Sequence, residues 1–173
     1  MGSLIKKIFV KLIHTFPIII LYILVLTGFD LSFTLYERSF SFNFVSVVIF
    51  YWVLKKPDLL GYGLVFFSGL INDVVQDFPI GISSINYLSL CAIAAFISAR
   101  TFLPNLLYDW LLFFVAILIV SSIDYSVLTL IFDFPIKYET LMLNSFITFL
   151  MYPILAKIFD EINILDSKQE NAQ

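Results

Sequence analysis

The chain has little of the chemistry on which most catalytic and metal sites are built. Its 173 residues include one cysteine and one histidine, and only 13% of them are charged. The single cysteine, Cys91, excludes an internal disulfide, and together with His14 it cannot complete a Cys/His metal site. The sequence also lacks a nucleophile triad, a phosphate-binding glycine loop and a histidine-based acid and base pair. We therefore expect no enzyme, no cofactor and no resident metal.

Apolar residues dominate what is there. They make up 61% of the chain, with 20 Phe and 9 Tyr, and the mean hydropathy is +0.99, far outside the balance of soluble domains. Segments of this kind should be helices, because lipid offers the backbone no partners and period-2 alternation is absent. We expect an all-α membrane protein with six transmembrane helices in one bundle, at roughly 14–30, 42–54, 59–76, 80–99, 109–131 and 140–158.

The second segment, 42–54, is short for a span, since its 13 residues give about 20 Å of helix. Either Ser39 to Ser41 extend it, or neighbouring helices shelter it. The distribution of basic residues indicates that it crosses. Six spans with a cytoplasmic N-terminus place eight Lys and Arg residues inside and two outside, whereas omitting this span gives four inside and six outside. We expect both termini in the cytoplasm.

The two ends of the chain differ in polarity. The N-terminus has a basic start and an apolar run, but no small-x-small cleavage site follows, so we expect a retained first span. The transmembrane domain should end near residue 159. The tail, 160–173, is polar, and we expect it to be disordered in the cytoplasm.

The third segment carries a small and polar face. On a helix, Gly61, Ser68 and Asn72 share one stripe, and Gly69 and Asp73 lie on the next. A carboxylate facing lipid costs several kcal/mol, so this face should look into the bundle or toward a wet cavity, with Asp73 against helices five and six. Two interpretations stay open: a polar lock between helices that also stops the third helix, or a partner-contact or gating role.

Further polar residues form a second predicted feature, a seam in the outer halves of helices three to six. Its members are Asp124, Asn144 and Asn86. We hypothesise that Arg38 or Lys137, the only basic residues expected outside, pairs with Asp73 or Asp124. In the last helix, Pro153 should cause a kink by freeing the carbonyl of Phe149.

One stretch resembles a known family. Residues 51–88 read YWVLKKPDLLGYGLVFFSGLINDVVQDFPIGISSINYL, and they resemble MreD, the rod shape-determining membrane protein family: an aromatic pair, a basic-Pro loop, an apolar helix ending in G-L-x-x-D, then P-x-G. The matching positions here are Tyr51, Trp52, Pro57, Gly69, Leu70, Asp73, Pro79 and Gly81.

The resemblance implies a non-enzymatic scaffold of the bacterial cell-elongation complex, in the cytoplasmic (inner) membrane, which supports lateral peptidoglycan synthesis and cell shape. It implies binding to an MreC-like bitopic membrane protein, and through it to MreB, RodA and a penicillin-binding transpeptidase, with no nucleic acid partner. Self-association stays open. The expected contact positions are Tyr51, Trp52, Gly61 and Ser68, although packing within the bundle explains each of them equally well.

The same resemblance supplies an alternative. The family is similar in fold to the S subunits of energy-coupling-factor transporters, so the chain could instead be a substrate-binding S-type subunit for vitamin uptake. Short outer loops and a first helix without the alanine coupling face, FPIIILYILVLTGF, favour the scaffold.

Overall fold

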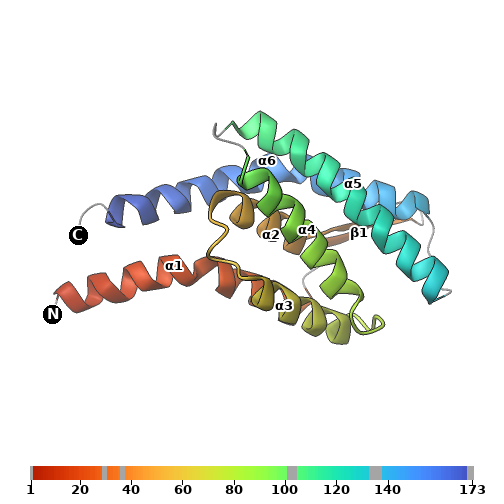
Figure 1. Cartoon of the computed structure of the whole chain (residues 1–173), viewed down its shortest axis with the longest axis horizontal. Coiled ribbons are helices and arrows are strands. Elements are labelled where there is room, and N and C mark those ends of the chain that lie inside the picture. Colours follow the sequence, from red (N-terminus) through yellow and green to blue (C-terminus); the bar gives the residue numbers. More distant parts are fainter. Residues whose placement is uncertain (1, 29–30, 36–37, 101–104, 133–137, 171–173) are drawn as a thin grey trace.

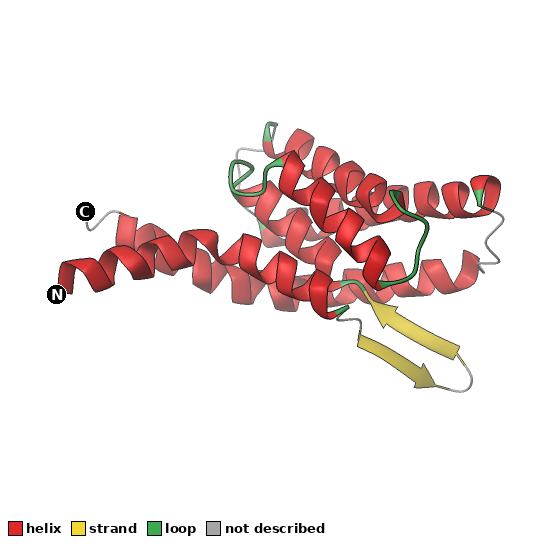
Figure 2. Cartoon of the chain, turned by 90° about the horizontal axis from the view of Figure 1, so that it is seen from below, coloured by secondary structure: helices red, strands yellow, loops and turns green. Residues whose placement is uncertain are grey.

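The computed structural model describes the backbone of residues 2–28, 31–35, 38–100, 105–132 and 138–170, and side chains within 15–28, 41–100, 105–132 and 138–164. In these ranges the chain forms six helices and one β-hairpin (Figures 1 and 2). Their order is α1 (Gly2–Thr27), β1 (Leu31–Leu35), β2 (Arg38–Phe42), α2 (Phe44–Lys55), α3 (Tyr62–Val75), α4 (Ile82–Ser98), α5 (Leu106–Ile131) and α6 (Tyr138–Glu170).

The helices pack around α2. It contacts α1, α4 and α6, while α3 packs on α4 and α5 packs on α6. The start of α1 and the end of α6 lie at the same end of the molecule in both views (Figures 1 and 2). The hairpin lies beside the bundle, and β2 contacts α6.

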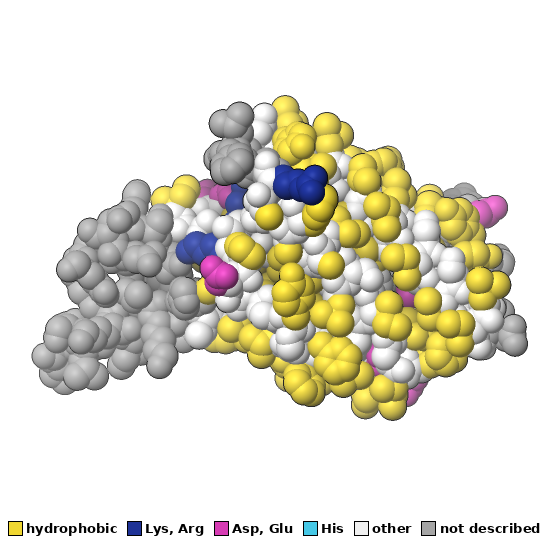
Figure 3. Space-filling view, viewed as in Figure 1, with side chains coloured by type: hydrophobic (Ala, Val, Ile, Leu, Met, Phe, Trp, Pro, Cys, Tyr) yellow, Lys and Arg dark blue, Asp and Glu magenta, His cyan; other side chains and the backbone are white. Residues whose placement is uncertain are grey.

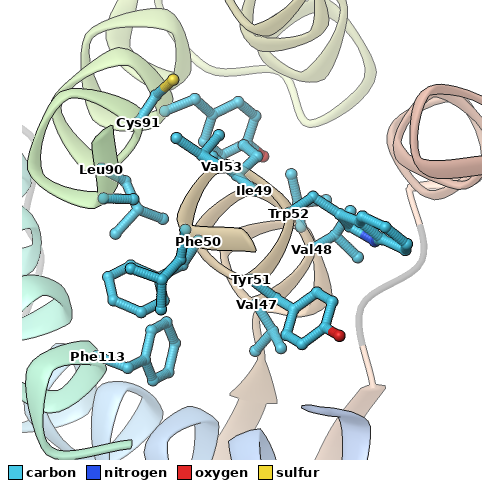
Figure 4. Packing of buried hydrophobic residues seen from close by; sticks show 14 of the residues in the cluster. Val47, Val48, Ile49, Phe50, Tyr51, Trp52, Val53, Leu90, Cys91 and Phe113 are labelled. Atoms are coloured by element: carbon cyan, nitrogen blue, oxygen red, sulfur yellow. The ribbon is translucent and has the colours of Figure 1, made fainter. Parts of the chain in front are cut away.

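The helix α2 is short and lies at the centre of the bundle. All ten residues from Val45 to Leu54 are buried. Their side chains radiate in every direction, with Phe50 toward Phe113 of α5, and Ile49 and Val53 toward α4 (Figure 4). A helix that is apolar all round is stable only when neighbours cover all its faces. The neighbouring helices therefore shelter this segment, as one of the two sequence interpretations held.

The hairpin corrects the other interpretation. Ser39 to Ser41 do not extend α2, because they belong to β2, which pairs antiparallel with β1 so that Phe33 lies opposite Phe40 and Ser32 opposite Ser41. The expectation that period-2 alternation is absent was wrong for this short segment, RSFSF, in which serine and phenylalanine alternate. The prediction of an entirely helical fold thus missed one supersecondary unit.

The helix bounds agree with the expected segments to within a few residues at most ends. The chief differences are that α1 begins at Gly2 and that α6 continues to Glu170, through most of the tail expected to be disordered. By length and composition, two of the described helices could cross a membrane, 106–131 and 138–164, and four shorter helical stretches are also apolar. In Figure 3, hydrophobic side chains are spread over the described part of the face and few charged side chains lie among them, which is compatible with contact to lipid.

Candidate functional site: the polar end of the bundle

Asp73, near the end of α3, caps the start of α4. Its carboxylate is fully buried, and its Oδ2 accepts a hydrogen bond from the Gly81 backbone N–H at 2.6 Å while Oδ1 accepts one from the Ser83 N–H at 2.8 Å. The first N–H groups of a helix have no partner within the helix and carry partial positive charge. The negative charge of Asp73 is therefore matched by a helix terminus.

The hydrogen-bond partners of the Asp73 side chain lie at the start of α4. Its charge also acts on Asp124 of α5, and its placement against helices five and six stays a prediction. The hypothesis that Arg38 or Lys137 pairs with Asp73 or Asp124 falls on two side chains outside the described residues.

Close packing of α3 on α4 depends on Gly69. A Cβ atom built on Gly69 would lie 2.4 Å from the Cα of Ser84, far inside van der Waals contact with the backbone of α4. The two helices can approach this closely only because Gly69 has no side chain. Because the helices lie this close, the Ser84 hydroxyl can donate a hydrogen bond to the Phe66 carbonyl, at 3.0 Å.

The turn between the helices completes the arrangement. Asn72 Nδ2 donates to the Ser83 Oγ at 2.9 Å, and Pro79 lies in the tight turn that follows α3. Gly81 is the N-cap of α4 and has φ 106°, a left-handed conformation that side chains disfavour. We call Gly69, Asn72, Asp73, Pro79, Gly81, Ser83 and Ser84 the α3–α4 lock; it contains all five residues that the sequence predicted to form a structural lock.

Beside this lock lies a polar cavity of about 250 Å³, to which all six helices and β2 contribute. It brings together the three residues of the predicted seam, Asn86 from α4, Asp124 from α5 and Asn144 from α6. Asn144 fixes the hairpin to the bundle, because its Oδ1 accepts from the Ser41 N–H at 3.0 Å and its Nδ2 donates to the Ser41 Oγ at 2.8 Å. Ser121 and Ser145 join α5 to α6 with a hydroxyl pair at 2.6 Å.

Three of the four expected partner-contact residues lie inside the bundle. Tyr51 and Ser68 are 0% exposed and Trp52 is 2% exposed. The Tyr51 hydroxyl donates to the Asp160 Oδ1 at 2.6 Å, and the Tyr51 ring packs on Phe159. Gly61 alone of the four is exposed. In the described structure, Tyr51, Trp52 and Ser68 therefore pack against other parts of the same chain.

One ion pair was not predicted from the sequence. Lys55 at the end of α2 donates to the Asp109 Oδ2 at 2.7 Å, and the two side chains are 21% and 4% exposed. From the sequence, Lys55 was expected only to lie on the cytoplasmic side. The available signal was Asp109, an acidic residue in the first turn of α5 that is followed by apolar residues up to Val120.

Comparison with known proteins identifies the family. No match is found among curated proteins or among solved structures. Neither result supports the alternative of a substrate-binding transporter subunit. The family described as "rod shape-determining protein MreD" matches residues 7–162, which is nearly the whole chain. The chain therefore belongs to the MreD family of membrane proteins that act in rod shape determination.

Proposed function

We propose that this chain is a non-enzymatic scaffold of the cell-elongation complex, in the inner membrane of a rod-shaped bacterium. The observation that carries the proposal is the family match over residues 7–162. In this role it binds an MreC-like bitopic membrane protein and, through it, acts with MreB, RodA and a penicillin-binding transpeptidase in lateral peptidoglycan synthesis. Self-association is compatible with the same role.

The structure offers support of a physical kind. The conspicuous polar side chains of α3 hold helices together: Asp73 caps α4, and Asn72 bonds Ser83. The outer surface is apolar, including Phe67 on α3 and Leu111 on α5. Lipid gives no hydrophobic drive for helix association, so a partner span would be held by close packing on such a surface.

We also propose six spans with both termini in the cytoplasm, in a bundle like that of the transporter S subunits. The basic residues favour this topology, and the adjacent ends of α1 and α6 are compatible with an even number of crossings.

Two measurements test the scaffold. Depletion of the protein should turn rod-shaped cells round, and an affinity-tagged chain should copurify with an MreC-like protein but not with an unrelated single-span protein expressed at the same level. Cells that keep their rod shape on depletion, with no MreC-like protein recovered, would contradict the proposal.

A surface variant sharpens the copurification. Gly61 is exposed, and a Cβ atom there would meet nothing within 4 Å, so Gly61→Leu adds bulk to the surface without a steric clash at Cβ. We expect it to recover less of the MreC-like partner than the wild type does. Ala92→Leu, at an exposed position on α4, is the matched control and should recover the wild-type amount.

A further inference from the structure

The polar cavity contains two groups that the fold does not use. Most of its polar side chains bond one another or the backbone: Asn144 bonds Ser41, Ser121 bonds Ser145, and Thr148 accepts from the Asn43 N–H. By contrast, the Asp124 carboxylate makes no hydrogen bond or ion pair within the part of the chain that the structure describes. The Oδ1 of Asn86 is buried and also has no donor.

These two groups lie close together. Asn86 and Asp124 both line the polar cavity, and both also border a narrow crevice between α4 and α5 whose other walls are isoleucine and valine. A carboxylate in such surroundings is costly when nothing compensates its charge. Among the described residues that line the cavity, none is Lys, Arg or His.

The nearby carboxylate of Asp73 adds negative charge near Asp124 and does not compensate it. Its two oxygens already accept hydrogen bonds from the start of α4, and it is not among the residues that line the cavity. Among the described residues, the oxygens left over are those of the partly exposed Asp124 carboxylate, which carries a negative charge, and of the Asn86 amide. The complementary ligand has N–H donors and a positive charge.

The volume limits the size of that ligand. Pockets for drug-sized molecules measure roughly 300–1,000 Å³, and this cavity, at about 250 Å³, lies just below that range. Apolar side chains, such as Val45, Ile117 and Leu128, share the wall and can contact a short alkyl chain.

From this arrangement we propose that the polar cavity binds a small organic cation, an alkylammonium or alkylguanidinium. Asp124 provides the counter-charge, Asn86 Oδ1 accepts a second hydrogen bond from the cation, and the apolar wall holds the alkyl chain. The inference does not depend on the scaffold role, because it concerns a site inside this chain and can hold whether or not a partner is bound.

The test compares three probes on the purified full-length protein in detergent micelles: butylammonium, the neutral 1-butanol, and tetramethylammonium, which has charge but no N–H. Binding is followed by isothermal titration calorimetry and by the thermal unfolding midpoint. We expect saturable binding of butylammonium, weaker binding of tetramethylammonium, and no saturable effect of 1-butanol. Equal effects of butylammonium and 1-butanol on the wild type would overturn the proposal.

Variants locate the site. Asp124→Asn should weaken butylammonium binding at least tenfold, and Asn86→Leu should weaken it severalfold. Asp77→Asn is the control, since Asp77 is exposed at the end of α3 and does not line the cavity. Unchanged affinity in Asp124→Asn would overturn the assignment. Without ligand, Asp124→Asn should unfold at the wild-type temperature or higher, because it removes an uncompensated charge. If Asp124→Asn fails to fold, Asn86→Leu and the comparison of the three probes still test whether the cavity binds the cation.

Discussion

The indole of Trp110 on α5 donates its Nε1–H to the backbone carbonyl of Phe149 on α6, at 2.8 Å. Phe149 lies four residues before Pro153, and proline has no N–H to complete the helical bond to that carbonyl. A side chain from the neighbouring helix therefore satisfies the acceptor that Pro153 leaves free. The two rings also stack, with centroids 4.7 Å apart.

Trp110→Phe should destabilise the protein, because it removes the donor and leaves a carbonyl unsatisfied in an apolar environment. The cost of such a group is about 1–3 kcal/mol. Pro153→Ala restores an N–H to α6, so the same Trp110 substitution should cost less in that background. A double-mutant cycle on unfolding free energies in detergent measures the coupling; equal costs in both backgrounds would show that the two residues act independently.

Asp73→Ala should destabilise the protein by about 2 kcal/mol, as loss of a helix cap that makes two charge-assisted bonds. Asp73→Asn should cost less, since its amide oxygen can still accept one of the two bonds. Asp77→Asn, at the exposed neighbour, is the control for loss of a negative charge at this end of α3, because asparagine tolerates the positive φ of 55° at this position. An unfolding temperature of Asp73→Ala equal to that of Asp77→Asn would exclude the cap as a source of stability.

Gly69→Ala should force α3 and α4 apart, because its Cβ would meet the Ser84 backbone at 2.4 Å. Overpacking of this kind costs typically about 1–3 kcal/mol. Gly63→Ala is the matched control on the same helix, where a Cβ meets nothing within 4 Å. It should be neutral or stabilise by up to about 1 kcal/mol, from the higher helix propensity of alanine. The difference between the unfolding midpoints of Gly69→Ala and Gly63→Ala measures how much stability is lost when a Cβ is added where α3 and α4 approach closely.

These local features were the ones that the sequence could predict. Gly69, Asp73 and Gly81 lie within one stretch of 13 residues, and their order already indicates a helix that ends, turns and restarts. The outer polar residues were predicted to converge, because a membrane penalises each of them separately. The bond from Asn144 to Ser41 was not predictable in the same way, since it joins residues 103 positions apart and needs a hairpin whose strands have five residues each.

The ion pair between Lys55 and Asp109, at the C-terminal end of α2, was also not predictable from the sequence. A single sequence contains no signal that matches Lys55 to an acid 54 positions away. It also could not tell whether Tyr51 and Trp52 face a partner or the core, because aromatic residues suit both. Only the packing of α2 on its neighbours, which buries both side chains, decides between those interpretations for the described structure.

Lys55→Met should be among the most destabilising single changes at that end, because it leaves the buried Asp109 carboxylate without its cation. Removing one partner of a buried pair costs about 3–5 kcal/mol, and the partial exposure of Lys55 places the expected value at the lower end. The double variant Lys55→Met with Asp109→Leu should recover much of the loss, since replacing both partners avoids the buried charge. A double variant as unstable as Lys55→Met alone would show that the pair contributes through something other than charge compensation.

Cysteine labelling in intact cells tests the six-span topology. Because Cys91 is the only native cysteine and is buried, Cys91→Ala gives a background for single introduced cysteines. With both termini in the cytoplasm, Asp77→Cys, between α3 and α4, should react with a membrane-impermeant maleimide added outside. Asp58→Cys and Ala99→Cys, in the preceding and following turns, should react only after permeabilisation. All three positions are exposed, so differences in labelling do not come from burial within the protein. If α2 does not cross the membrane, the pattern inverts, with Asp58 and Ala99 labelled from outside and Asp77 protected.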